Sequence, residues 1–91
     1  MGKYKVFLRK SAYQEILGIP ANTRKKIENR ISALKSDPRP YGSEKMAGCD
    51  FYRVRQGDYR VVYSIDEKEK MVVIEKIGHR KDVYRRGVHE D

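Results

Sequence analysis

The sequence predicts an α+β fold, in which an N-terminal strand and a helical hairpin pack on one face of a mainly antiparallel sheet of about three to four strands. Three observations predict it. Residues 3–8 alternate polar and apolar side chains, residues 27–34 carry an apolar stripe with helical spacing, and residues 51–77 are dense in Val, Ile and Tyr. No repeat or linker interrupts the chain, so we expect one domain over residues 1–91.

The first strand and the first helix follow one another closely. Residues 3–8 have the alternation typical of a strand with one buried face. Ser11 suits the N-cap of a short helix over residues 12–17, and Gly18 with Pro20 ends that helix.

A second helix is expected to begin near Asn22, which suits its N-cap. Ile27, Ile31 and Leu34 recur at i, i+4 and i+7, which places them on one face of the helix. The prolines of residues 36–40 cannot continue the helix, so it ends there. This helix therefore packs on the sheet by one face.

The three remaining strands are expected at residues 51–56, 59–66 and 71–77. Gly57-Asp58 fits a two-residue type II′ turn, since the first central position needs a positive φ. This turn fixes the register, which pairs Gln56 with Tyr59, Arg55 with Arg60, Val54 with Val61, Arg53 with Val62 and Tyr52 with Tyr63.

Alternation along this hairpin gathers Arg53, Arg55 and Arg60 on one face, hereafter the arginine face. The other face is apolar and consists of Tyr52, Val54, Tyr59, Val61, Tyr63 and Ile65. Like charges on facing strand positions destabilise a sheet by up to about 1 kcal/mol, so the cluster needs an explanation. A bound phosphate would supply one, because the guanidinium fork matches its oxygens. The alternative is a solvated face, with Asp58 or an acid from outside the hairpin offsetting the repulsion.

The charge balance points to the same class of ligand. The chain has 21 Lys and Arg against 13 Asp and Glu, a formal net charge of +8. Such an excess favours a polyanionic partner, with nucleic acid first and an acidic protein second, although a charged surface also serves solubility. No stretch approaches the roughly 20 apolar residues that span a bilayer, and Cys49 stands alone, so we expect a cytoplasmic protein without disulfides.

A second cluster follows the last strand, at residues 78–86. We expect this segment to return across the arginine face and to bring His79, Arg80 and Tyr84 to it. Histidine exchanges protons near neutral pH, arginine stabilises charge on a reacting phosphate, and tyrosine stacks on a base or donates its hydroxyl. The alternative for His79 is a surface histidine at a strand end.

Several enzyme classes lack their motifs here. The sequence has no glycine-rich phosphate loop with its lysine, no zinc-ligand spacing and no Ser or Cys nucleophile motif. We therefore expect no metal and no cofactor. Phosphodiester cleavage would then use the 2′-hydroxyl of RNA as the nucleophile, which restricts a nuclease to RNA.

Two motifs together resemble a known family. The segment YRVRQGDYRVVY (residues 52–63), followed by IGHRKDVY (residues 77–84) behind a strand and a helical hairpin, is similar to the RelE/ParE superfamily of toxin–antitoxin toxins, on the RelE side. The resemblance covers residues 3–86. It implies a ribosome-dependent mRNA endoribonuclease that cleaves in the A site and inhibits translation, and a RelB-like antitoxin as partner.

The resemblance also implies roles for individual residues. Arg60 matches the arginine that stabilises charge in the transition state, Arg80 matches one that supports the phosphate, and Tyr84 matches a tyrosine that contacts the substrate.

Arg53 and Arg55 stand where the RelE pattern has two lysines, one of them a proposed general base. They are expected to bind substrate, because arginine does not give up its proton at any relevant pH. The proton acceptor is left open between His79, Tyr84 and ribosomal RNA.

Two other functions remain open. A ParE-type toxin has the same fold and inhibits DNA gyrase, and a non-catalytic module would use the arginine face only to bind phosphates. The segment after residue 77 favours the RelE type over the ParE type.

Overall fold

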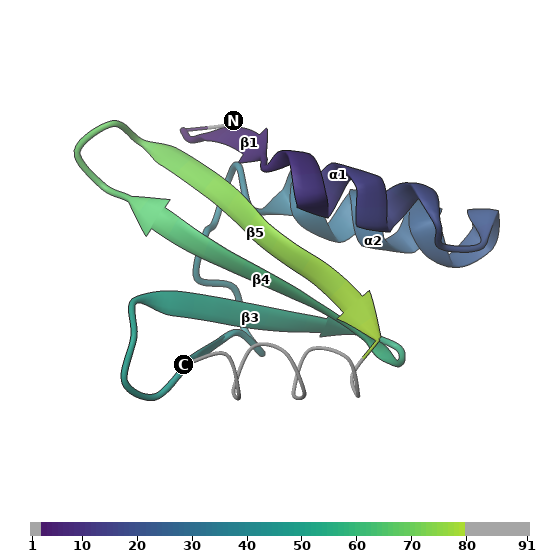
Figure 1. Ribbon diagram of the computed structural model, residues 1–91. Helices are drawn as coiled ribbons and strands as arrows, with labels where there is room; N and C mark the ends of the chain where they lie inside the picture. The colour runs from purple at the N-terminus through teal and green to yellow at the C-terminus, as the bar shows by residue number, and fades with distance from the viewer. Residues whose placement is uncertain (1–2, 80–91) are drawn as a thin grey trace.

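The computed structural model in Figure 1 describes residues 3–79, in which one five-stranded sheet carries two helices on one face. The elements in chain order are β1 (Lys5–Leu8), α1 (Lys10–Leu17), α2 (Ala21–Ala33), β2 (Glu44–Lys45), β3 (Phe51–Gln56), β4 (Tyr59–Asp66) and β5 (Met71–His79). The strand order is β1-β5-β4-β3-β2, and β1 runs parallel to β5 while the other pairs are antiparallel. The predicted α+β fold is confirmed with all four predicted strands, and β2 is added to them.

The helix α1 begins one residue before Ser11, so the predicted N-cap at Ser11 is wrong. Arg9 occupies the N-cap position without a side-chain cap, and its N–H still bonds to the carbonyl of Ile74 at 3.1 Å. The Arg9 carbonyl in turn accepts the N–H of Tyr13 at 2.9 Å. The chain thus passes from the last bond of the β1–β5 pair directly into the helix, which leaves Ser11 inside the first turn.

The N-cap predicted at Asn22 is also wrong. The helix α2 begins at Ala21, and Pro20 precedes it with φ −53° and no side-chain cap. The Pro20 carbonyl accepts the N–H of Arg24 at 2.8 Å. The proline ring fixes φ near the helical value, so the helix starts immediately after it.

The core lies between the helices and one face of the sheet. The predicted stripe of α2 is buried, with Ile27 and Leu34 at 0% exposure and Ile31 at 6%. Its partners are Ala12, Ile16, Ile19, Val54, Val61, Tyr63, Val72, Ile74 and Ile77. Burial of one such isoleucine side chain contributes about 2–3 kcal/mol to stability, which explains the helical spacing of the stripe.

The far end of β5 is fastened to α1 rather than to another strand. Because β1 ends at Leu8, no strand within residues 3–79 pairs with the β5 edge beyond Ile74 on that side. The Glu15 carboxylate accepts the N–H of Ile77 at 2.9 Å and binds Lys76 Nζ at 2.6 Å. One carboxylate therefore holds the strand that leads to His79.

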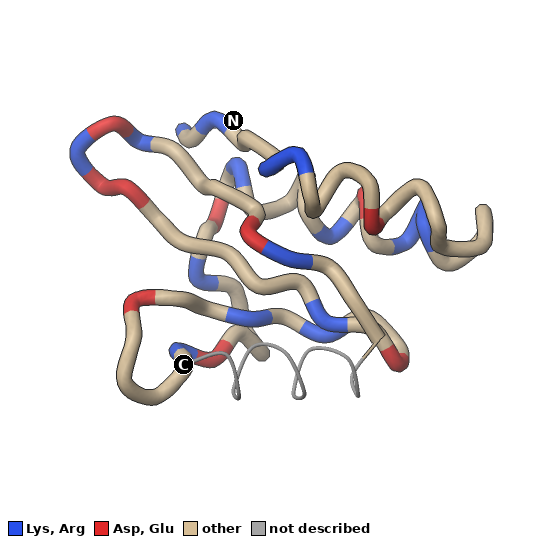
Figure 2. Tube along the Cα trace, viewed as in Figure 1, with Lys and Arg blue, Asp and Glu red and all other residues tan. Residues whose placement is uncertain are grey.

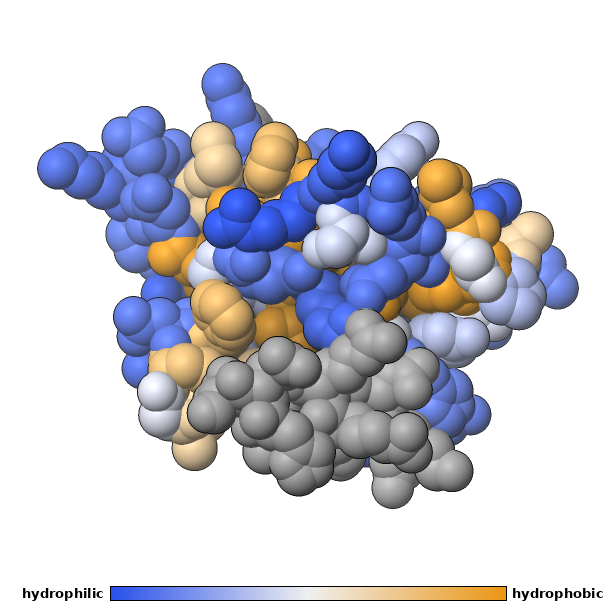
Figure 3. Space-filling view, in the orientation of Figure 1, coloured by the Kyte–Doolittle hydropathy of each residue, from blue (hydrophilic) through white to orange (hydrophobic). Residues whose placement is uncertain are grey.

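Most of the face seen in Figure 3 is hydrophilic, with smaller apolar patches that include the region of the helices. Exposed apolar side chains occur on β1 and α1, where Phe7, Tyr13 and Leu17 are each about half exposed. Among residues 3–79, neither helix has the length and apolar character needed to cross a membrane.

Candidate nucleic-acid interface

The β3–β4 hairpin builds the arginine face in the predicted register. Arg55 pairs with Arg60 and Arg53 pairs with Val62. Gly57 has φ +62° and Asp58 lies outside the positive-φ region, as a type II′ turn requires. Figure 2 shows the basic positions of β3 and β4 lying side by side near this turn. The predicted register and the division into two faces are confirmed.

The three arginines differ in depth. Arg55 is exposed, the Arg53 side chain is 26% exposed, and Arg60 is 4% exposed. Arginine is seldom buried to this degree, because removing a guanidinium from water is costly. A buried guanidinium is held in place, so it can act on a reacting charge without reorganisation. The arginine face therefore has a buried member, Arg60, and an exposed one, Arg55.

Glu44 supplies a carboxylate to this face, and the sequence analysis did not find it. The strand β2 pairs Glu44 with Arg53, whose Nη2 and Nε both bind Glu44 Oε1, at 2.8 Å and 3.2 Å. Arg53 lowers the pKa of Glu44, with smaller contributions from Arg55 and Arg60. An acid from outside the hairpin thus offsets part of the repulsion between the arginines. Gly48, at φ +79°, was the available sequence signal for the turn that returns β2 to β3.

His79 lies on the other side of the sheet. It pairs with Tyr59, and the two rings meet edge to face at 5.6 Å between centroids. Tyr59 packs against the core, so alternation puts the His79 ring on the helix face, although its neighbour Gly78 pairs with Arg60. The expectation that His79 would share the face of Arg55 and Arg60 is therefore wrong. Arg80 and Tyr84 lie outside the described residues.

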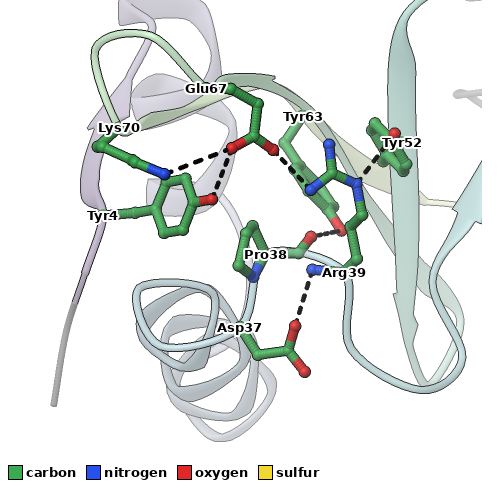
Figure 4. A network of polar contacts seen from close by, with 8 residues as sticks. All are labelled: Tyr4, Asp37, Pro38, Arg39, Tyr52, Tyr63, Glu67 and Lys70. Atoms are coloured by element: carbon green, nitrogen blue, oxygen red, sulfur yellow. Dashed lines mark hydrogen bonds and ion pairs between the residues drawn. The ribbon is translucent and has the colours of Figure 1, made fainter.

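A second polar cluster centres on Arg39, in the connection between α2 and β2 (Figure 4). Arg39 Nη1 binds Glu67 at 2.6 Å, its Nε donates to the Tyr52 hydroxyl at 3.2 Å, and its guanidinium lies over the Tyr52 ring. Glu67 also accepts the Tyr4 hydroxyl at 2.8 Å and lies 3.8 Å from Lys70 Nζ. These contacts raise the pKa of Arg39 and lower the pKa of Glu67.

The same connection is also held by Tyr63, which is fully buried. Its hydroxyl donates to the Pro38 carbonyl at 2.7 Å (Figure 4). Tyr63 and Arg39 together fix the segment that leads into β2, and β2 carries Glu44 to the arginine face. The cluster thus fastens the connection that precedes β2, in which Glu44 pairs with Arg53.

A small open sheet with two helices on one face and arginines on the other defines a class, because solved RelE structures have this fold. The chain superposes on a chain of the archaeal RelE–RelB complex from Pyrococcus horikoshii OT3 with a TM-score of 0.77 and 30% identity, covering 86% of this chain and 96% of that one. Residues 6–84 match the family model described as the ParE toxin of type II toxin–antitoxin system, parDE. The chain belongs to this family of type II toxins.

Two curated relatives lie on the RelE side of the superfamily. RelE1 of Methanocaldococcus jannaschii, named as a candidate toxin, is 30% identical over 87 residues, which are 91% of this chain and 97% of that protein. Toxin RelG of Mycobacterium tuberculosis is 46% identical over 63 residues, which are 66% of this chain and 70% of that protein. The predicted membership of the RelE/ParE superfamily is confirmed.

Proposed function

We propose that this chain is an mRNA endoribonuclease that cleaves in the ribosomal A site. The observation that carries the proposal is the convergence of Arg53, Arg55 and Arg60 on one face of the sheet, with Arg60 buried. Backbone phosphates of RNA are the ligand such a face fits best. The RelE names of the two curated relatives support the same choice.

The proposed reaction is an intramolecular transesterification of the RNA backbone. The 2′-hydroxyl oxygen attacks the adjacent phosphorus, the bond to the 5′-oxygen breaks, and the products are a 2′,3′-cyclic phosphate and a 5′-hydroxyl. A base removes the 2′-hydroxyl proton and an acid donates one to the leaving oxygen. Arg60 stabilises the negative charge that builds on the phosphate oxygens, while Arg53 and Arg55 hold the strand. No metal or cofactor takes part in this scheme.

The remaining proposed site residues are Arg80, for the phosphate, and Tyr84, for contact with the substrate. The proton acceptor is open between His79, Tyr84 and ribosomal RNA. The ring of His79 is directed towards Tyr59, so it would have to reach the arginine face around the end of the strand.

We also propose a RelB-like antitoxin as partner, because the related toxin of Pyrococcus horikoshii was solved as a RelE–RelB complex. Acidic side chains of the antitoxin would cover the arginine face. Expression of this chain alone is expected to arrest growth, and co-expression of the antitoxin is expected to relieve the arrest. Unaffected growth with abundant folded protein would contradict the proposal.

The decisive experiment is primer extension on mRNA held in a programmed ribosome, compared with naked mRNA. Cleavage in the A site that leaves a 2′,3′-cyclic phosphate supports the proposal. Inhibition of gyrase supercoiling without cleavage would instead establish the ParE-type function, which the description of the family model favours. Binding without either effect would leave a nucleic-acid-binding module.

Substitution of Arg60 tests its role in the reaction. Arg60→Ala is expected to reduce cleavage by about 100-fold or more, the usual effect of losing one preorganised donor to a transition state. Affinity for the ribosome should stay close to that of the wild type. Since Arg60 is buried, circular dichroism and thermal melting are used to test whether the variant folds. Arg55→Ala is a second variant, at an exposed position where a loss of folding is not expected.

Lys25→Ala is the matched control, because it removes one positive charge from the exposed surface of α2. It should change cleavage little. Equal loss of cleavage and of binding in Arg60→Ala would argue for a binding module rather than for catalysis.

A further inference from the structure

A cavity of about 430 Å³ opens beside the arginine face, at the edge of β3 beyond its two-residue pairing with β2. Its lining residues are Arg30, Tyr41, Gly42, Glu44, Val54 and Arg55. Val54, which is 3% exposed, contributes apolar surface, while Arg55 and Glu44 also belong to the arginine face. The cavity is therefore continuous with the proposed phosphate-binding surface.

Tyr41 is presented to this cavity by a hydrogen-bonded turn. The N–H of Ser43 bonds to the carbonyl of Pro40 at 3.0 Å, and Gly42 has φ +94°. These are the marks of a type II turn with Tyr41 at its first central position. Tyr41 is fully exposed, so its ring contributes nothing to the core. The turn places Tyr41 in solvent beside the cavity that it lines.

Two cationic side chains line the same cavity. Arg30 Nη2 donates to the Arg55 carbonyl at 3.1 Å, which anchors the end of α2 to the edge of β3. The Arg55 side chain is exposed and reaches the arginine face. A nucleotide with its phosphate at Arg55 would have its base next to the cavity.

Glu44 adds an acceptor of hydrogen bonds. Both of its hydrogen bonds to Arg53 use Oε1, and within residues 3–79 no side chain or backbone group donates to Oε2. Adenine, cytosine and guanine carry exocyclic amino groups that donate to such an oxygen, whereas the donor of uracil, its ring N3–H, lies between two carbonyl oxygens that repel a carboxylate. The acceptor therefore favours a base with an amino group.

We propose that this cavity, the Tyr41 pocket, binds one base of single-stranded RNA, which stacks on Tyr41 and donates an amino proton to Glu44. Aromatic rings and arginine planes are the surfaces on which unpaired RNA bases stack. The inference rests on the proposed function, because it takes mRNA as the ligand of the arginine face. The pocket gives the toxin a preference for the base next to the cleaved phosphate.

The test compares Tyr41→Ala with Tyr41→Phe in the programmed-ribosome cleavage assay, on mRNAs that differ by one base. Loss of one stacked base corresponds to a fall in kcat/KM of between about 5-fold and about 150-fold, so Tyr41→Ala should fall within this range. Tyr41→Phe keeps the ring and should remain within about 2-fold of the wild type. Glu44→Gln should weaken the preference for amino-bearing bases over uracil. Tyr13→Ala removes a half-exposed tyrosine from α1 and serves as control.

A spectroscopic readout keeps the pocket testable if the chain does not cleave RNA. A 2-aminopurine base in a short single-stranded RNA should lose fluorescence when it stacks on the wild type or on Tyr41→Phe, and should keep it with Tyr41→Ala. Quenching without cleavage would overturn the proposed function and leave the pocket standing.

Cleavage and quenching that are unchanged in Tyr41→Ala would overturn the pocket and leave the proposed function intact. If Tyr41→Ala loses only neutralisation by the antitoxin, the surface binds protein instead of RNA, and the inference is likewise overturned.

Discussion

At the scale of single residues, Tyr63 shows how one buried hydroxyl couples stability to pH. Tyr63→Phe removes the donor to the Pro38 carbonyl and leaves that buried oxygen without it. We expect a loss of about 1–3 kcal/mol in the free energy of unfolding at neutral pH, measured by urea denaturation.

The same substitution should change how the free energy of unfolding depends on pH in the alkaline range. Burial raises the pKa of Tyr63 from 10.0 to about 12. A raised pKa means that the unfolded chain ionises first, so this part of the stability is complete below pH 10 and is lost as the pH rises towards 12. Tyr63→Phe lacks the ionisable group, so its deficit should shrink over that interval. The exposed Tyr13→Phe is the control, and a deficit that is constant with pH would contradict the assignment.

The local sequence pattern was sufficient to predict that the three arginines share one face, but not to predict how each of them is surrounded. Alternation about the Gly57 turn placed Arg53, Arg55 and Arg60 together, because both rules are local. Neither rule predicts how deeply a side chain is buried. The burial of Arg60 depends on what covers the strand, so it emerged only from the folded chain.

At the scale of elements, the Gly57 turn fixes the register on which the site depends. Gly57→Ala would put a side chain at φ +62°, so it should destabilise the fold by about 1–3 kcal/mol in urea denaturation, although a Cβ there meets no atom within 4 Å. The cost is one of backbone conformation rather than of space.

Gly18→Ala is the matched control for that prediction. Gly18 has φ −86°, and a Cβ at this position would lie at an ordinary 3.6 Å from the Glu15 carbonyl oxygen. Its effect should be neutral or stabilising by up to about 1 kcal/mol. Equal destabilisation by both substitutions would show that φ is not the cause.

The errors at the element scale have different origins. Ser11 is a good capping residue, yet the pairing of β1 with β5 starts α1 earlier, and this tertiary contact outweighs a local preference worth about 1 kcal/mol. At α2 the cause is local, because the ring of Pro20 starts the helix before Asn22. The strand β2 has two residues, too few to show a period.

At the scale of the whole molecule, the Arg39 cluster joins Tyr4, which directly precedes β1, to the α2–β2 connection, β3 and the β4–β5 turn (Figure 4). The carboxylate of Glu67 should make the stability of the fold depend on pH in the acidic range. Tyr4 and then Arg39 lower the pKa of Glu67 below 4.5, so the stability it confers is present above that value and is lost as the pH falls through the lower folded pKa.

Glu67→Gln should therefore be less stable than the wild type at pH 7, and the difference should narrow as the pH falls below about 4.5. Thermal melting over pH 2–7 measures the effect. Glu69→Gln removes an exposed carboxylate from the same turn and should show a smaller difference. A difference in melting temperature between the wild type and Glu67→Gln that is the same at every pH would show that the charge of Glu67 does not contribute to stability.

The sequence by itself determined the fold class, the apolar stripe of α2, the hairpin register and the gathering of the arginines. The stripe, the register and the arginine cluster each follow from a period or a turn that is complete within about 20 residues, and the fold class follows from the order of such elements. Tertiary structure alone decided that Arg60 is buried, that Glu44 reaches Arg53, and that His79 faces Tyr59. These outcomes depend on segments brought together by packing, and the identity of a packing partner is not encoded in a local pattern. Assembly of the sheet gathers part of the excess charge of +8 into the candidate site, since it brings Arg53, Arg55 and Arg60 together.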